Sequence, residues 1–231
     1  MVTGVTEMPL TWSVVIPVKV LALAKSRMAG QDGGRPLGRP GQRGLSPAQR
    51  AELALAMAAD TVAAAVACPA VGAVLVVTDD GTVADALGGL GAVIIPDAPG
   101  SGLNAALLHG AEQATGRWPD WGRAAMAADL PALSPGELAA ALTAASAAAE
   151  AFVPDAAGTG TTLYAARPGV TFWPLFGPGS RDAHQAHGAV ELKLPGIAGL
   201  RQDVDTPSDL RLAAALGLGP ASASVAEALG I

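Results

Sequence analysis

The sequence predicts an α/β fold in which a mostly parallel sheet carries helices on both faces, and three observations support it. Short apolar runs alternate along the chain with longer helical segments rich in Ala. Their order is strand, helix, strand, helix, strand, helix, strand, which is typical of parallel sheets with crossover helices. The 231 residues, 51% of them hydrophobic, suit one large domain or two small ones. No linker separates two parts, so we expect a single domain over residues 1–231.

The first half of the chain supplies three of the expected strands. Residues 13–18 form a continuous apolar, β-branched run, and residues 74–77 and 92–95 are further short apolar runs. Between the first two, the Gly- and Pro-rich residues 29–45 predict a flexible loop. A helix is expected over residues 46–67, because it opens with Ser-Pro-Ala-Gln, which can form a capping box with proline at the first helical position.

The second half continues this alternation. A helix is expected over residues 102–115, and an Ala-rich helix, opened by another capping box, over residues 134–150. The remaining expected elements are a strand at 124–128, a hairpin of strands at 152–153 and 161–165, a short strand within 197–204, and a last helix that begins at 206 and ends near 217.

Composition excludes several classes of protein. A net charge of −6 argues against a general nucleic-acid binder. No run of about 18 apolar residues is present, so no membrane span is expected. The N-terminal residues lack the basic segment of a signal peptide. The single cysteine, Cys68, excludes an internal disulfide framework and fits a reducing compartment, so we expect a cytoplasmic protein. A homodimer is compatible with the sequence.

Positive charge is concentrated at the start of the chain. Residues 1–50 contain seven Lys and Arg residues against two acidic ones, a local excess of +5 in an acidic protein. Lys19, Lys25 and Arg27 follow the first strand, and a loop there could place them over a triphosphate, where they would neutralise a leaving pyrophosphate. The alternative is that they are exposed surface charges. No P-loop motif occurs in the chain.

Two further residues are candidates for nucleotide contacts. Thr78 ends the second expected strand, and Asn104 closes a Gly-Ser-Gly-Leu-Asn segment that could line a base or ribose. Ligands in such sheets bind beyond the carboxyl ends of the strands, where Lys19 and Lys25 are also expected. These four residues form the predicted nucleotide site.

Three aspartates are candidates for a magnesium site. Asp129 follows one expected strand, and Asp203 and Asp205 lie near the end of another. Mg²⁺ prefers oxygen ligands, typically one or two carboxylates with substrate phosphates and water. Alternate residues of a strand share a face, so Asp203 and Asp205 could both point at the metal. The alternative is that one of them caps the helix that begins at residue 206.

Two loops could seat a small acceptor that carries phosphate and carboxylate groups. Residues 158–162 read Gly-Thr-Gly-Thr-Thr and residues 176–180 read Phe-Gly-Pro-Gly-Ser, so both offer backbone N–H groups and hydroxyls. The alternative is two ordinary turns. His184 and His187 could share a helix face, but without a third clear nitrogen or sulfur ligand no zinc site is expected. They contact substrate or are simply exposed.

In their order and spacing, these motifs resemble the phosphoenolpyruvate / 2-phospho-L-lactate guanylyltransferases over about residues 13–220. The motifs are Pro17-Val18-Lys19, Ala24-Lys25-Ser26-Arg27, Asp129-Leu130-Pro131-Ala132-Leu133, Gly158-Thr159-Gly160-Thr161-Thr162, Phe176-Gly177-Pro178-Gly179-Ser180, His187-Gly188-Ala189-Val190-Glu191 and Asp203-Val204-Asp205-Thr206-Pro207-Ser208-Asp209-Leu210. Residues 30–44 look longer than the usual loop of that family, as a lid over the triphosphate or an inert insertion.

The resemblance implies a nucleotide-diphospho-sugar transferase-like fold, a Rossmann-like arrangement of three layers. It implies GTP as donor, Mg²⁺ as cofactor, phosphoenolpyruvate as acceptor, and a role in making the deazaflavin coenzyme F-420. It also implies that Thr161 or Thr162, with Gly177 and Ser180, binds the acceptor. The threonine is ambiguous because a one-residue insertion could separate the two motifs.

The expected reaction is in-line attack by an acceptor phosphate oxygen on the α-phosphorus of GTP, with loss of pyrophosphate. That oxygen is already ionised at neutral pH, so positioning and charge neutralisation suffice. Phospholactate and phosphoglycerate are competing candidates for the acceptor. Competing hypotheses for the activity are a molybdenum-cofactor nucleotidyltransferase, whose glycine-rich first loop is missing here, a sugar transferase, and a nucleotide-binding regulator that catalyses nothing.

Overall fold

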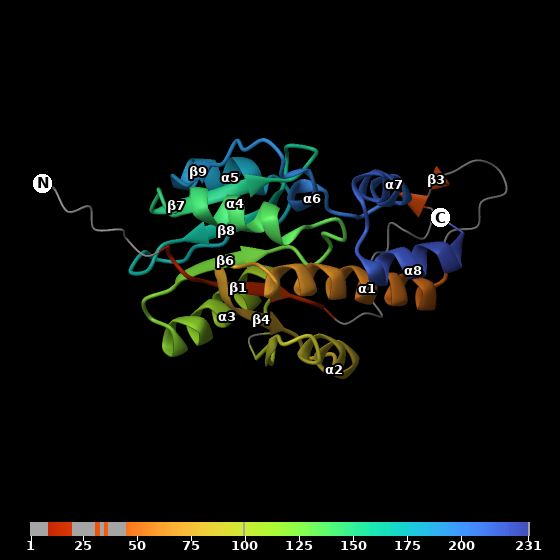
Figure 1. The fold of residues 1–231 in the computed structure, drawn as a ribbon, viewed down its shortest axis with the longest axis horizontal. Coiled ribbons are helices and arrows are strands. Elements are labelled where there is room, and N and C mark those ends of the chain that lie inside the picture. The colour runs from red at the N-terminus through yellow and green to blue at the C-terminus, as the bar shows by residue number, and fades with distance from the viewer. Residues whose placement is uncertain (1–8, 20–30, 33–34, 37–44, 99, 231) are drawn as a thin grey trace, which may run out of the picture.

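The computed structural model describes residues 9–19, 45–98 and 100–230, and the backbone of residues 31–32 and 35–36. Its main feature is a seven-stranded sheet in the order β5-β4-β1-β6-β8-β7-β9 (Figure 1). The strands are β1 (Trp12–Pro17), β4 (Val71–Val77), β5 (Val93–Ile95), β6 (Gly122–Met126), β7 (Glu150–Pro154), β8 (Thr161–Ala166) and β9 (Val190–Glu191). Only β8 runs antiparallel to its neighbours, so the predicted mostly parallel sheet is confirmed.

Helices cover both faces of this sheet and complete three layers (Figure 1). They are α1 (Pro47–Val66), α2 (Gly81–Gly88), α3 (Leu103–Arg117), α4 (Pro135–Ala145), α5 (Ser180–His187), α6 (Ala198–Arg201), α7 (Pro207–Leu216) and α8 (Pro220–Leu229). A separate antiparallel pair is formed by β2 (Gln31–Asp32) and β3 (Arg35–Pro36). No helix in the described part of the chain combines the length and the apolar character that crossing a membrane requires.

The side chains of β1 divide between two core clusters because successive strand residues point to opposite faces. Val14 and Ile16 belong to a cluster with buried residues of α1, α2 and α4. Val15 belongs to a second cluster with buried residues of α3 and the aromatic side chains of β7 and β8. The central strand is therefore covered on both sides, as its uninterrupted apolar sequence predicts.

Local sequence signals explain where several helices begin. Ser46 with Gln49, and Ser134 with Glu137, form complete capping boxes with proline in the first turn, as predicted. Thr206 and Asp209 form a third box at α7. The start of α8 lacks a side-chain cap of its own. Instead, the buried Asp60 of α1 accepts from the N–H groups of its first turn, at 3.1 and 2.7 Å, and so fixes α8 against α1.

Two expectations about elements are wrong. The short strand expected within residues 197–204 is absent, and α6 occupies Ala198–Arg201 instead. A single helical turn closes there, since the N–H of Gln202 donates to Ala198 O at 3.1 Å, and it buries Leu200. The helix expected to reach residue 150 ends at Ala145, and Glu150 already begins β7. The loop expected over residues 29–45 lies mostly outside the described residues.

Candidate active site

Several of the predicted site residues gather at one edge of the sheet because of strand direction. The strands β1, β4, β6 and β7 run the same way, so their carboxyl ends share an edge. Since β8 runs the opposite way, its first residues lie at that edge too. Lys19, Thr78, Asp129 and Thr161 all adjoin it, which agrees with the rule that ligands bind beyond the carboxyl ends of strands.

On the nucleotide side of the site, the structure describes only part of the predicted set. Lys19 is exposed just beyond β1, and the preceding N–H, of Val18, donates to Val77 O at 3.0 Å. The side chain therefore stands where β1 and β4 end together. The predicted residues Lys25 and Arg27 lie outside the described residues.

Thr78 and Asn104 both make contacts within the protein. Thr78 is buried, and its hydroxyl accepts from the N–H of Asp80 at 3.1 Å, in the turn that leads into α2. The Asn104 amide donates to Phe176 O at 3.0 Å and accepts from Phe176 N at 2.9 Å. Asn104 thus joins the start of α3 to residues 176–180, a role that the sequence did not predict.

Carboxylates crowd together between β6 and α7. The N–H of Val204 donates to Asp129 O at 3.1 Å and holds residues 203–205 beside Asp129. The Val204 side chain is buried against Leu53 and Met57, while its neighbours Asp203 and Asp205 are only partly buried. Burial, reinforced by the charges of Asp129, Asp205 and Asp155, raises the pKa of Asp203 to about 7.

The donor set fits a hard divalent cation bound together with substrate. Thr206 and Asp209 cap α7, so the alternative that Asp203 or Asp205 does so is not needed. Among the residues that the structure describes, no three His, Cys, Asp or Glu side chains converge as a complete metal site. Mg²⁺ commonly takes one or two carboxylates and completes its shell with phosphate and water oxygens, so a pair from Asp129, Asp203 and Asp205 suffices.

The two predicted acceptor loops lie side by side. Thr161 and Ser180 are both buried, and the Nδ1 atom of His184 lies 3.0 Å from the Thr161 hydroxyl and 2.9 Å from Ser180 O. The Thr162 hydroxyl instead faces Val153 O, at 3.5 Å. Gly177 has φ of 134°, a conformation that favours glycine, and its carbonyl accepts from Ser180 N. Of the two threonines, Thr161 is the one placed beside the second loop.

His184 is the residue at the centre of this region, and the sequence did not assign it this role. The N–H of Leu175 donates to its Nε2 at 3.0 Å, so Nε2 carries no proton and Nδ1 carries the ring hydrogen. The imidazole is fully buried and stacks on Tyr164, with ring centroids 4.8 Å apart. Burial lowers its pKa to about 4, and the nearby His187 acts in the same direction.

One feature of the sequence could have identified His184. It lies four residues after Ser180 at the start of a short helix, so its side chain faces back toward that residue. Its other partners, Thr161 and Leu175, come from β8 and from a loop. Those contacts depend on the tertiary fold and leave no local pattern in the chain.

Comparison with known proteins supports a common origin with one enzyme family. A model of the MobA-like NTP transferase domain matches residues 54–171. A phosphoenolpyruvate guanylyltransferase from Thermomonospora curvata is 57% identical over 217 residues, which are 94% of this chain and 89% of that protein. The chain belongs to the phosphoenolpyruvate guanylyltransferase family. Another phosphoenolpyruvate guanylyltransferase, from Streptomyces coelicolor, is 52% identical over 220 residues, 94% of this chain and 97% of that protein.

Solved structures support the fold of this nucleotidyltransferase. A protein described as a nucleotide-diphospho-sugar transferase, from Desulfovibrio desulfuricans, superposes with a TM-score of 0.62 at 15% identity, over 87% of this chain and 85% of that one. A nucleotidyl transferase from Methanothermobacter gives a TM-score of 0.56 at 22% identity, over 89% and 97%. The expected nucleotide-diphospho-sugar transferase-like architecture is therefore confirmed.

Proposed function

We propose that this protein, as a single nucleotidyltransferase domain, transfers GMP from GTP to phosphoenolpyruvate. The products are enolpyruvoyl-2-diphospho-5'-guanosine and pyrophosphate, and the reaction serves biosynthesis of coenzyme F-420 in the cytoplasm. The observation that carries the proposal is the 57% identity, over nearly the whole chain, to a phosphoenolpyruvate guanylyltransferase. The convergence of cationic, carboxylate and hydroxyl side chains at one sheet edge supports it.

The nucleotide half of the reaction needs neutralised phosphate charge. Lys19, Lys25 and Arg27 contact the triphosphate and stabilise the charge that develops on the departing pyrophosphate. Thr78 and Asn104 border the bound nucleotide. Asp129, Asp203 and Asp205 supply the carboxylates that hold Mg²⁺, which when bound offsets negative charge on the phosphates. Relief of the crowding among these carboxylates favours the bound cation.

The acceptor half of the reaction needs positioning. Thr161, Gly177 and Ser180 border the acceptor, while His184 holds Thr161 and Ser180 in place. The attacking phosphate oxygen is ionised at neutral pH, so no side chain has to remove a proton from it. The protein then acts by aligning this oxygen with the α-phosphorus of GTP and by excluding other orientations.

A panel of acceptors tests the proposal. The protein is incubated with GTP, Mg²⁺ and, separately, phosphoenolpyruvate, 2-phospholactate or 3-phosphoglycerate, and the products are identified by mass spectrometry. We expect the guanosine diphosphate ester and pyrophosphate to form most rapidly with phosphoenolpyruvate. Faster turnover of phospholactate would reassign the acceptor, and GTP binding without pyrophosphate release from any acceptor would favour a regulator.

A further inference from the structure

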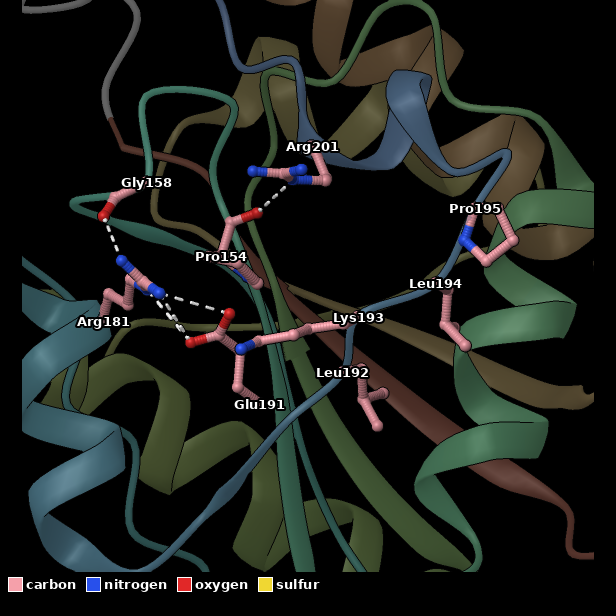
Figure 2. A pocket seen from close by; sticks show the side chains of 9 residues that line it. All are labelled: Pro154, Gly158, Arg181, Glu191, Leu192, Lys193, Leu194, Pro195 and Arg201. Carbon is pink, nitrogen blue, oxygen red and sulfur yellow. Dashed lines mark hydrogen bonds and ion pairs between the residues drawn. The ribbon is translucent and has the colours of Figure 1, made fainter.

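A pocket of about 460 Å³ opens between the end of β7, the turn at Gly158 and the segment that follows β9 (Figure 2). Its charged lining residues are Arg181, Glu191, Lys193 and Arg201. Three of these four are cations. None of them belongs to the residues that we assign to GTP, Mg²⁺ or the acceptor.

The single carboxylate in this lining is already neutralised. Arg181 Nε donates to Glu191 Oε2 at 3.0 Å, and Nη2 donates to Oε1 at 3.3 Å, which makes a two-point pair (Figure 2). The third nitrogen, Nη1, donates to Gly158 O at 3.1 Å. Arg181 and Glu191 therefore cancel each other, and the remaining charge of the lining, +2, comes from Lys193 and Arg201.

Two of the three guanidinium nitrogens of Arg201 donate hydrogen bonds to the backbone and hold the side chain in place. Its Nε donates to Pro154 O at 3.1 Å and its Nη2 donates to Asp155 O at 2.7 Å. Across the described part of the chain, Nη1 makes no hydrogen bond. The Asp155 carboxylate turns into the hairpin and accepts from Thr159 N and Gly160 N, so it does not neutralise this guanidinium.

Lys193 is the second unneutralised cation. Its side chain is exposed at the pocket, and no described residue pairs with its ammonium group (Figure 2). A guanidinium held by two hydrogen bonds and an exposed ammonium on one concave surface match an anion with two or more oxygens, because charged donors bind phosphate and carboxylate strongly.

We propose that this pocket binds a small anion bearing phosphate or carboxylate groups, with Lys193 and Nη1 of Arg201 as its ligands. Free phosphate has this chemistry, and so does a phosphorylated carboxylic acid such as phosphoenolpyruvate. The proposal concerns binding alone and stands whether or not GMP transfer is the reaction.

Binding of inorganic phosphate to the full chain, measured by isothermal titration calorimetry without nucleotide, tests the pocket. We expect Lys193→Ala to weaken this binding by roughly tenfold, and Lys193→Arg to keep it within about threefold. Arg117→Ala is the matched control, because Arg117 is an exposed cation at the far end of α3, and its loss should leave binding unchanged. Equal affinities in the parent and Lys193→Ala proteins would overturn the proposal.

Steady-state kinetics then separates the two sources of the anion. If phosphoenolpyruvate itself uses the pocket, Lys193→Ala raises its KM by a similar factor and leaves the KM for GTP unchanged. If the anion is separate, both KM values stay unchanged while phosphate affinity falls. Both results support the site, and neither depends on Asp129 or the other residues of the proposed reaction.

Discussion

At the scale of single residues, the buried imidazole of His184 makes the stability of the fold depend on pH. Its pKa is about 4 in the fold against 6.5 as an ordinary histidine. Between these values the unfolded chain binds a proton that the folded chain does not, so stability falls as the pH falls through this window. Protonation would also give Nε2 a hydrogen that faces the N–H of Leu175.

We therefore expect the free energy of unfolding to drop between pH 7 and pH 5, with about 2 kcal/mol of the drop due to His184. Urea unfolding at the two pH values measures this. His184→Gln is the control, since glutamine offers an acceptor for Leu175 N but does not titrate. An equal drop in the His184→Gln protein would show that other groups cause the acid sensitivity.

The two threonines of β8 give a sharp comparison. The Thr161 hydroxyl is 3.0 Å from His184 Nδ1, whereas the Thr162 hydroxyl lies 3.5 Å from Val153 O, its one hydrogen-bond partner among the residues that the structure describes. We expect Thr161→Val to raise the KM for phosphoenolpyruvate by about tenfold, as the loss of one hydrogen bond allows, and Thr162→Val to change it less than about threefold. Steady-state kinetics at saturating GTP measures both KM values. A larger increase for Thr162→Val than for Thr161→Val would show that Thr162 is the threonine that borders the acceptor.

Replacing one of the crowded carboxylates should raise the stability of the protein and lower its activity. Asp203→Asn removes one of several like charges held close together, so we expect a higher Tm than the parent when EDTA removes divalent cations. The same change should lower kcat with Mg²⁺ by about 100-fold or more if Asp203 helps to hold the metal. Thermal scans and initial rates on one preparation measure both. A lower Tm in EDTA would show that Asp203 is needed for folding.

At the scale of elements, α3 packs on the sheet through glycine. A Cβ at Gly110 would overlap Val15 Cγ1 and lie 2.8 Å from Val77 Cγ2, whereas Gly116 on the same helix has nothing within 4 Å. We expect Gly110→Ala to destabilise the protein by about 1–3 kcal/mol through overpacking. Gly116→Ala should stabilise it by up to about 1 kcal/mol. Chemical denaturation of both variants measures this, and stabilisation by Gly110→Ala would mean that α3 can move outward.

The sequence predicts best those helices and strands whose evidence lies within a few neighbouring residues. The capping boxes at Ser46 and Ser134 and the apolar runs of β1 and β4 each contain their own evidence within a few residues. The prediction at α6 was wrong because four residues of helix are too short to show a period. The predicted end of α4 was wrong because an alanine run contains no stop signal.

The candidate site divides in the same way. Asp129 was a natural candidate because it follows the apolar run of β6 at the edge where ligands bind, whereas the sequence left Thr161 and Thr162 undecided. The links from His184 to Thr161 and from Asn104 to Phe176 join segments 23 and 72 residues apart. No pattern in a single sequence reports such contacts, and the same holds for the cations of the proposed anion pocket, which lie on α5, α6 and the segment after β9.

At the scale of the whole molecule, both halves of the site rest on one sheet, so ligand binding should stabilise the entire fold. We expect Mg²⁺ and GTP at about 100 times the Kd to add roughly 2.7 kcal/mol to the free energy of unfolding. Thermal shift with GTP, with ATP, and with GTP plus EDTA measures this. The proposal of a guanine-specific, metal-dependent site predicts the largest shift for the first condition, and equal shifts for all three would contradict it.

The reversed direction of β8 has an evolutionary consequence. In a wholly parallel sheet, each loop at the working edge leads into a crossover helix, and a change in its length disturbs packing on a whole face. Here the chain doubles back between β7 and β8 through a short hairpin loop, residues 155–160. Such a loop can gain, lose or exchange residues while the flanking strands stay paired. Changes in this loop would let related proteins differ in the acceptor that they select, while the parallel strands that carry the proposed nucleotide and magnesium residues keep their packing.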